Sequence, residues 1–373
     1  MRKIFQFIFC LFILALPYSC GKSKLQEKTK EDQKETKDES LQLFLQSYES
    51  LFKTHFNATG CPGAAVVIVK DSSIIFMKSF GIKEVGKPDS VNTNTVFRIA
   101  SLSKAFSAVL TGILVEKKLL NWNDKVISYL PDFELNDTGQ TKRIEIQHLL
   151  SHTTGLPRHA LGEYIEDGMA LPDIMKKMKK VKLEGEEGKF FAYQNVAFSV
   201  IQEIVKSKTN KEFIDWMREE IFKKGNMKHA SITYNEFINE PNKAIPHDGK
   251  NKEYVPVPIH ANYYNVAAAG GINASISDMA AWLNILLGYR PDIVSKQTLD
   301  HVFTPFIEMN KEKDEDRVEY YDVWDGVQHS YYGMGWRIIQ YNNRTLIHHG
   351  GFVNNYRSEI AIDRGNKIGI CIL

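Results

Sequence analysis

Apolar residues along the chain follow two periodicities, and each predicts a different kind of element. Residues 39–56, ESLQLFLQSYESLFKTHF, carry apolar side chains at helical spacing, which predicts an amphipathic helix. Residues 63–81 hold two β-rich runs around a polar turn, which predicts a β-hairpin. From residue 97 to about 300 the pattern is mainly helical. Strand-like runs return near the end, at 332–340, 344–350, 356–363 and 366–373.

The order of these elements predicts how the chain is organised. Strands at both ends with helices between them predict one antiparallel sheet built from the two chain ends, flanked by helices, with a helical region inserted. We therefore expect an α/β part at about 41–96 and 305–373 joined to an all-α part at about 97–304. The sequence contains no internal repeat.

The stretch 96–115, VFRIASLSKAFSAVLTGILV, is apolar on nearly every side, so it predicts a helix in the middle of the protein. Lysine is almost never buried without a partner, yet this stretch contains Lys104 three residues after Ser101. Residues at this spacing share a helix face, and a lysine kept neutral by burial can take a proton from a serine. The pair predicts an activated nucleophile at a helix N-terminus. Because Ser50 and Lys53 match the same S-x-x-K pattern on an amphipathic helix, the pattern alone decides nothing.

The N-terminus has the pattern of an export signal. Arg2 and Lys3 precede an apolar run over 4–16 and the sequence PYSCG, which predicts a signal peptide at 1–19. We expect Cys20 to be the lipidated first residue of the mature chain, with an ordinary secretory signal as the alternative. Residues 20–40 are almost all polar and alternate in charge, which predicts a solvated, disordered tether. The expected location is a membrane-anchored lipoprotein facing the periplasm or the cell exterior.

Composition narrows the classes of partner. The 373 residues are 43% hydrophobic and 25% charged, which allows a large core, and the net charge of +2 comes from scattered acids and bases. Scattered charges of both signs do not create a positive electrostatic potential that would bind a polyanion, so we expect no nucleic-acid partner.

Further motifs follow Ser101 and Lys104 in a fixed order along the chain. They are LLSHTTGLP (149–157), FAYQNVAFSVIQEIV (191–205), AAAGGINASISDMAAWL (267–283), YGMGWRI (332–338) and HHGG (348–351). Together they resemble the serine β-lactamase and penicillin-binding protein superfamily, in its class C-like branch with D,D-peptidases and related esterases. The resemblance covers about residues 41–373 and implies the β-lactamase/D,D-peptidase-like fold.

The resemblance implies a role for each matching residue. Ser101 would be the acylated nucleophile and Lys104 its proton acceptor. Tyr193 would relay protons between nucleophile and leaving group, and Asn195 would hold Lys104 or the acyl amide of the substrate. The Y-x-N pattern also occurs at 263–265 and 341–343, but Tyr193 lies in a loop directly before an amphipathic helix, as the family requires.

Two positions depart from the family pattern. Glu187 stands where the family usually has a proline before glycine. The usual K-T-G element would be His348, His349 and Gly350, which would contact the substrate, and the N–H of Gly351 with that of Ser101 would form the oxyanion hole. Histidine is mostly neutral at pH 7, so this element lacks the permanent cation that binds a substrate carboxylate. Both histidines weaken the case for an efficient β-lactamase.

The expected reaction is acyl transfer through a Ser101 ester followed by hydrolysis, with no metal or organic cofactor. The substrate would be a small ester or amide, or a peptide such as a peptidoglycan stem peptide, for a D,D-peptidase-like or esterase-like enzyme. The alternatives are a β-lactamase proper and a catalytically weak penicillin-binding or sensing module. His148 and His152 have the spacing of metal ligands on a helix but lack the accompanying glutamate, so the superfamily loop explains them better.

The resemblance also bears on the cysteines and on the end of the chain. In the family sheet the first strand pairs antiparallel with the last, which would bring Cys61 near Cys371; a disulfide and two free thiols are both open. Family members continue past the last strand with a helix that covers the sheet. We expect an apolar face to be left bare here, in a fragment or in a shortened, aggregation-prone member.

Overall fold

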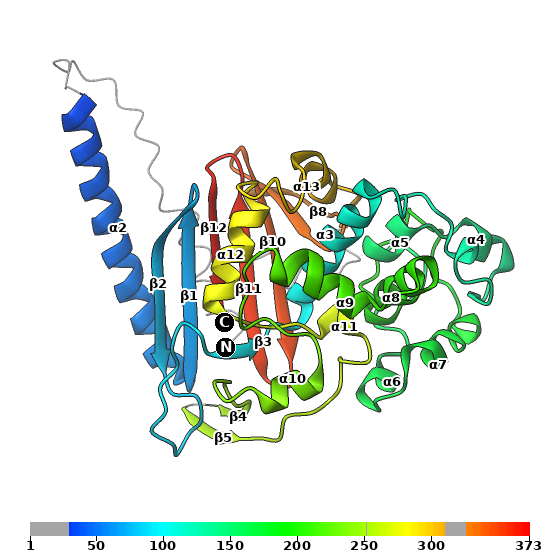
Figure 1. Cartoon of the computed structure of the whole chain (residues 1–373), viewed down its shortest axis with the longest axis horizontal. Helices are drawn as coiled ribbons and strands as arrows, with labels where there is room; N and C mark the ends of the chain where they lie inside the picture. The colour runs from blue at the N-terminus through cyan, green and yellow to red at the C-terminus, as the bar shows by residue number, and fades with distance from the viewer. Residues whose placement is uncertain (1–29, 251, 310–325) are drawn as a thin grey trace. The chain divides into compact units, whose positions relative to one another are not determined.

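The computed structural model describes residues 30–250, 252–309 and 326–373 (Figure 1). The predicted signal peptide and Cys20 lie outside these residues. The chain forms two compact units: one holds the residues up to Pro62 together with 249–255, and the other holds 63–248 and 256–373. None of the helices within the described ranges is long and apolar enough to cross a membrane.

The first unit is dominated by the helix α2 (Lys30–Thr59). Its apolar stripe is the predicted one, and Leu45, Tyr48 and Phe52 are buried. The helix begins nine residues before the predicted start, so residues 30–40 are helical and the expectation of a disordered tether is wrong for them. Glutamate, lysine and glutamine are good helix formers, which lets a helix continue into a polar segment. Residues 20–29 lie outside the described part of the chain.

The second unit contains an antiparallel sheet of eight strands in the order β2-β1-β12-β11-β10-β9-β8-β7 (Figure 1). The sheet is built from both ends of the chain, as predicted, because β1 pairs antiparallel with β12. Its strands are β1 (Gly63–Lys70), β2 (Ser73–Gly81), β7 (Ile307–Glu308), β8 (Val327–Tyr332), β9 (Arg337–Tyr341), β10 (Arg344–Val353), β11 (Tyr356–Asp363) and β12 (Ile368–Ile372). The predicted hairpin and the four C-terminal strands are present, whereas β7 and β8 were not predicted.

The register of β12 shows where Cys371 lies along β1. Cys371 lies opposite Val67, inside β1, whereas Cys61 precedes that strand. Both cysteines are free, and Cys371 is fully buried in the apolar core. The disulfide suggested by the pairing of the first and last strands is not formed, because β12 ends opposite the interior of β1 and places Cys371 against Val67 instead of beside Cys61.

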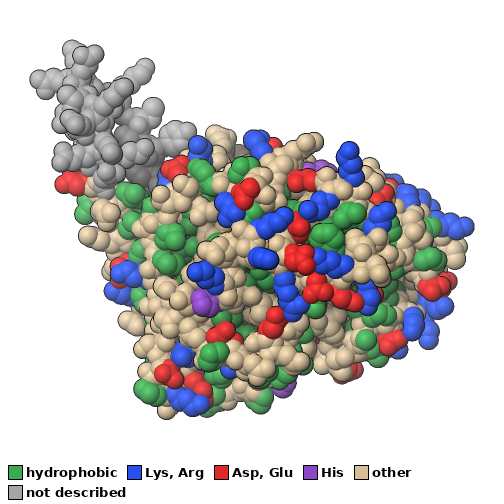
Figure 2. Space-filling model, in the orientation of Figure 1, with side chains coloured by type: hydrophobic (Ala, Val, Ile, Leu, Met, Phe, Trp, Pro, Cys, Tyr) green, Lys and Arg blue, Asp and Glu red, His purple; other side chains and the backbone are tan. Residues whose placement is uncertain are grey.

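Helices make up most of the region between the two sheet segments. They are α3 (Ser103–Glu116), α4 (Thr138–Arg143), α5 (Ile146–Leu150), α6 (Gly162–Glu166), α7 (Leu171–Met175), α8 (Asn195–Thr209), α9 (Phe213–Met217), the π-helix η4 (Arg218–Lys223), α10 (Tyr234–Asn239), α11 (Ala267–Gly270), α12 (Ile276–Leu286) and α13 (Lys296–Val302), with single 3₁₀ turns η1 (Ala100–Leu102), η2 (Val126–Ser128) and η3 (Met178–Lys180). On the face in Figure 2, basic and acidic side chains are interspersed rather than separated by sign.

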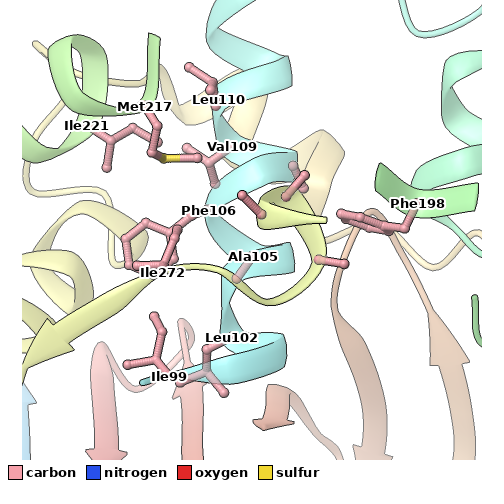
Figure 3. Packing of buried hydrophobic residues seen from close by; sticks show 14 of the residues in the cluster. Ile99, Leu102, Ala105, Phe106, Val109, Leu110, Phe198, Met217, Ile221 and Ile272 are labelled. Atoms are coloured by element: carbon pink, nitrogen blue, oxygen red, sulfur yellow. The ribbon is translucent and has the colours of Figure 1, made fainter. Parts of the chain in front are cut away.

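The helix α3 lies at the centre of this unit, as its apolar sequence predicts. All of its residues from Ser103 to Leu114 are buried. Figure 3 shows Phe106 and Val109 of α3 packed among side chains from α9, η4 and the segment before β6. The Phe106 ring also stacks on Trp282 of α12, with centroids 3.8 Å apart. Dense packing on all sides fixes the position of this helix.

The stretch 96–115 is not one helix. It begins with a short strand, β3 (Val96–Arg98), which pairs antiparallel with β6 (Asn273–Ser275), and η1 follows before α3 starts at Ser103. A second small sheet joins β4 (His247–Lys250) and β5 (Glu253–Pro256). Because β3 and β6 are three residues long and far apart in sequence, no local pattern reveals their pairing.

Candidate active site

Ser101 and Lys104 lie one helical turn apart, as their spacing predicts. Lys104 Nζ is 3.2 Å from Ser101 Oγ, and the lysine is fully buried while Ser101 is half-buried. Nζ also contacts two oxygens that only accept hydrogen bonds: Asn195 Oδ1 at 2.7 Å and the Ala269 carbonyl at 2.9 Å. A neutral amine donates two hydrogens and keeps one lone pair. In a neutral Lys104, donation of both hydrogens to these oxygens would leave the lone pair for the proton of the serine hydroxyl.

A short irregular stretch places Ser101 directly before the buried helix. Ala100 has a φ of +51°, a backbone conformation that is rare for residues other than glycine. The Ser103 hydroxyl donates to the Ala100 carbonyl at 2.7 Å and accepts from the Ile272 N–H at 3.0 Å. Buried hydrogen bonds therefore hold a strained residue immediately before the nucleophile, as is common at functional sites.

The loop before α8 brings Tyr193 and Asn195 to Lys104. Asn195 is the first residue of α8, and the centroid of the Tyr193 ring is 4.7 Å from Lys104 Nζ. The guanidinium carbon of Arg337 is 5.3 Å from the same centroid, so a permanent cation lies beside the phenol. Such a cation stabilises negative charge that develops on the hydroxyl oxygen. Of the other Y-x-N matches, 341–343 lies at the turn between β9 and β10 and takes no part in this cluster.

The two histidines of β10 are both buried. His349 is fully buried, with Nε2 3.1 Å from the Tyr332 hydroxyl and Nδ1 2.7 Å from the Gly350 carbonyl. Burial, and then the Arg337 charge, lower the pKa of His349 well below its usual value, so the ring is neutral. Side chains alternate along a strand, so His348 points to the opposite face, where burial lowers its pKa to about 3. Direct substrate binding by His348 and His349 stays a prediction, and both rings are buried here.

His349 is the end of a buried chain of hydrogen bonds that the sequence did not predict. His152 Nδ1 accepts from the Gln194 N–H at 3.1 Å, so a neutral His152 carries its hydrogen on Nε2, 3.2 Å from the Tyr332 hydroxyl. Tyr332 accepts there and donates to His349 Nε2. His349 then carries its hydrogen on Nδ1 and donates it to the Gly350 carbonyl. Every donor in the chain has one direction, which fixes the tautomer of both histidines.

The edge of β10 beside Ser101 offers backbone N–H groups. β9 pairs with β10 only as far as His348, so among the described strands none lies beside residues 349–353 on that edge. In contrast, a Cβ on Gly351 would come within 2.5 Å of the Ile99 carbonyl, which shows how closely β10 approaches the segment before Ser101. Only glycine fits at this position.

The turn after β10 decides which N–H groups face that edge. Asn354 and Asn355 both have positive φ, 44° and 63°, and close a two-residue hairpin between Val353 and Tyr356. The closing pair exchanges both of its hydrogen bonds across the hairpin, and the direction alternates along the strand. The Gly351 N–H is therefore directed to β11, and the neighbouring N–H of residue 352, a phenylalanine, faces the open edge. The predicted use of Gly351 is corrected by one residue.

Comparison with known families identifies the family and the fold of the chain. The profile of the family described as Beta-lactamase matches residues 48–373. The chain belongs to the Beta-lactamase family. Its fold is that of the family, with a large antiparallel sheet flanked by helices.

Individual relatives in the family are distant. The chain is 24% identical over 317 residues to Protein flp of Staphylococcus aureus strain MW2, and 25% identical over 337 residues to unguisins hydrolase ungD' of Aspergillus campestris. These matches cover 84% and 85% of this chain but 59% of each relative, so the chain spans well under two thirds of their length. An octameric penicillin-binding protein homologue from Pyrococcus abyssi has the same fold, with a TM-score of 0.71, 22% identity, and coverage of 89% of this chain and 72% of that one.

Three other residues near the family motifs have defined partners in the structure. Glu187, at the usual proline, forms a bidentate ion pair with Arg143 at the end of α4. His148 Nδ1 accepts from the Glu145 N–H at 3.1 Å, and no group of potential metal ligands occurs among the described residues. His159 lies beside the catalytic loop, since its N–H donates to the Tyr193 carbonyl at 2.9 Å.

Sequence reasoning missed three residues at this family site. Tyr332 and Arg337 belong to the YGMGWRI motif, which was noted without a role for either residue. Tyr263 was set aside as a chance Y-x-N match, although it precedes the alanines of α11 whose backbone binds Lys104. Aromatic or cationic residues directly next to family motifs were the available signal.

Proposed function

We propose that this protein is a serine hydrolase that forms a covalent ester on Ser101. The observation that carries the proposal is the 3.2 Å contact between Ser101 Oγ and the buried Lys104, which also donates to Asn195 Oδ1 and to the Ala269 carbonyl. The Ser101 proton passes to Lys104 Nζ while Oγ bonds to the carbonyl carbon of the substrate. Family membership supports this chemistry, because the family consists mainly of serine hydrolases.

The remaining steps follow from the groups around the nucleophile. The N–H groups of Ser101 and Phe352 bind the oxygen of the tetrahedral intermediate. The Tyr193 hydroxyl passes the proton from Lys104 to the leaving group as its bond to the carbonyl carbon breaks. Water then attacks the Ser101 ester, giving up its proton along the same route, and the acid is released with a free serine hydroxyl.

The charge of the site favours an esterase-like enzyme over enzymes that bind a substrate carboxylate, which are a β-lactamase proper and a D,D-peptidase. His349 is neutral and committed to Tyr332 and Gly350, so β10 presents no cation for a substrate carboxylate. The nearby permanent cation, Arg337, is only 3% exposed. A substrate that depends on carboxylate binding therefore gains less here than a neutral ester or amide. The export signal and the lipid anchor at Cys20 stay predictions from the sequence.

The proposal is tested by trapping the ester. The full chain is incubated with a p-nitrophenyl ester, and separately with a penicillin, and the intact mass is measured. We expect an acyl adduct or turnover in the wild type, and neither in Ser101→Ala. The matched control is Ser50→Ala, which removes the serine of the other S-x-x-K match, where Lys53 is paired with Glu49 at 2.7 Å.

The outcomes separate the alternatives. Ester turnover without a penicillin adduct indicates an esterase, and a long-lived penicillin adduct indicates a D,D-peptidase or sensing module. Rapid penicillin hydrolysis indicates a β-lactamase. A wild-type chain that neither turns over esters nor gains mass contradicts the proposal.

A further inference from the structure

The helix α11 presents a backbone carbonyl to Lys104, yet its own side chains cannot fix its position. Its sequence is AAAG, and the three alanines are buried. A helix of one turn leaves its first N–H groups and its last C=O groups without partners inside the helix. Val266, directly before α11, has an apolar side chain and cannot cap it. The polar groups that hold α11 therefore come from other elements.

Side chains of α8 and α3 bind the backbone of α11 at the same residue, Ala268. Gln202 Oε1, on α8, accepts from the Ala268 N–H at 2.8 Å. Ser107 Oγ, on α3, lies 2.7 Å from the Ala268 carbonyl and donates to it. Ala268 is fully buried, so neither of its polar groups can turn to water instead. The middle of α11 is thus held at both its N–H and its C=O.

The residues that hold α11 share helix faces with the catalytic groups. On α3, Ser107 lies three residues after Lys104, and on α8, Gln202 lies seven residues after Asn195. Lys104 Nζ donates to Asn195 Oδ1 at 2.7 Å and to the carbonyl of Ala269, the next residue of α11, at 2.9 Å. One face of each long helix therefore carries both a member of the lysine cluster and a group that fixes α11.

The chain that leads into α11 is fixed as well. The buried Arg98, in β3, donates from Nη1 to the His260 carbonyl at 2.9 Å and from Nη2 to the Asn262 carbonyl at 2.6 Å. Asn354, in the turn after β10, accepts from the His260 N–H at 3.0 Å. The loop 257–266 therefore reaches α11 along a defined path.

We propose that Gln202 and Ser107 are positioning residues that act through α11 and hold the Ala269 carbonyl against Lys104 Nζ. The inference rests on the proposed serine hydrolase function. A shift of Ala268 moves the Ala269 carbonyl as well, since both belong to one helical turn. Lys104 then loses a fixed acceptor, and its amine is less well oriented to take up and return protons. Because this change affects the chemical steps and not the binding of substrate, kcat should respond more than KM.

Four variants of the full-length protein test this assignment, with p-nitrophenyl butyrate as the substrate. Gln202→Met removes the acceptor for the Ala268 N–H at similar side-chain length, whereas Gln202→Glu keeps an acceptor oxygen. Ser107→Ala removes the hydroxyl that binds the Ala268 carbonyl. Thr111→Val is the matched control, because the Thr111 hydroxyl is also buried but donates within α3, to the Ser107 carbonyl at 2.8 Å. We measure kcat, KM and the free energy of unfolding for each.

We expect kcat to fall by about three- to tenfold in Gln202→Met and in Ser107→Ala, the effect of one lost hydrogen bond, with KM nearly unchanged. Gln202→Glu should recover the lost kcat. Thr111→Val should lose stability much as Ser107→Ala does but keep the wild-type kcat, so stability alone would not explain the difference.

Two results separate this assignment from the proposed function. Ser101-dependent turnover with a wild-type kcat in both Gln202→Met and Ser107→Ala overturns the assignment and leaves the hydrolase intact. The same holds if Gln202→Glu loses as much kcat as Gln202→Met, or Thr111→Val as much as Ser107→Ala. Absence of Ser101-dependent turnover in the wild type overturns both.

Discussion

At the scale of single residues, the site depends on which hydrogens each nitrogen carries. Lys104 donates to Asn195 and to the Ala269 carbonyl, which leaves its lone pair for Ser101. These acceptors remain when Nζ takes up the serine proton, so the charged lysine is also stabilised. The same contacts therefore serve before and after proton transfer, and little rearrangement is needed at the moment of reaction.

Removal of the Tyr332 hydroxyl tests the buried hydrogen bonds that join His152 to His349. Tyr332→Phe leaves the buried Nε2 of His152 without its Tyr332 partner and leaves Nε2 of His349 with only the longer 3.4 Å contact to Arg337 Nη1. We expect the free energy of unfolding to fall by about 1–3 kcal/mol, and kcat to fall more than KM rises because the edge of β10 is less well fixed. Denaturant unfolding and steady-state kinetics measure the two effects.

The control for this variant is Tyr331→Phe. Tyr331 points to the other face of β8, where its ring stacks on His329. It should unfold within about 0.5 kcal/mol of the wild type. Nitrogen NMR of the histidine rings adds an independent check, since the wild type should show a hydrogen on Nδ1 of His349. A hydrogen on Nε2 there would contradict the direction of the chain.

At the scale of elements, two asparagine turns set the phase of β10. Asn342 and Asn343 have φ of 44° and 62°, and Asn354 and Asn355 have 44° and 63°. Two-residue turns with positive φ at both positions fix the hydrogen-bonding pairs on each side, and both turns direct the same alternate residues to the same edge. The sequence shows both Asn-Asn pairs. The family motif suggested the N–H of Gly351 for the oxyanion hole. The alternation of hydrogen bonds counted from the turn gives the N–H of Phe352 instead.

The second of these turns provides a comparison between neighbouring residues. Glycine adopts this turn well, so Asn354→Gly keeps the turn. The substitution removes the hydrogen bonds of the Asn354 side chain to His260 and Pro258, in the loop 257–266. We expect kcat/KM to fall roughly three- to tenfold, since each lost bond weakens the loop by about 1 kcal/mol. Asn355→Gly changes the same turn without touching the loop and should keep the wild-type kcat/KM. An equal loss of kcat/KM in the two variants would show that activity depends on the turn itself and not on the hydrogen bonds of Asn354 to the loop.

At the scale of the whole molecule, local sequence patterns predicted elements and motifs, whereas contacts between segments far apart in the sequence were not predicted. The spacing of Ser101 and Lys104 indicated a pair, and the resemblance to the family assigned roles to these two residues and to Tyr193 and Asn195. The sheet built from both chain ends followed from the order of strand-like runs. The β3–β6 pair, the Tyr332 hydroxyl between two histidines and the grip of Arg98 on residues 257–266 join segments far apart in sequence. Such contacts depend on tertiary packing, which periodicity does not report.

Buried histidines give the folded molecule a predictable dependence on pH. Burial lowers the pKa of His152 and His349 well below the usual value and that of His348 to about 3. Above about pH 6.5 these rings are neutral in both the folded and the unfolded chain, and stability is undiminished. As the pH falls further, only the unfolded chain binds the extra protons, so the free energy of unfolding decreases. Each such histidine contributes a slope of about 1.4 kcal/mol per pH unit until its folded pKa is reached.

Replacing one of these histidines should therefore make the protein less sensitive to acid. We expect His348→Gln to reduce the slope of unfolding free energy between pH 6 and pH 5 by about 1 kcal/mol per unit, whatever its stability at pH 7. His329→Gln is the comparison variant, because it removes an exposed histidine from β8 instead of a buried one. Denaturant titrations at each pH give both slopes. If His348→Gln kept the wild-type slope, His348 would take up its proton in the folded and the unfolded protein over the same pH range. That result would contradict the lowered pKa of His348.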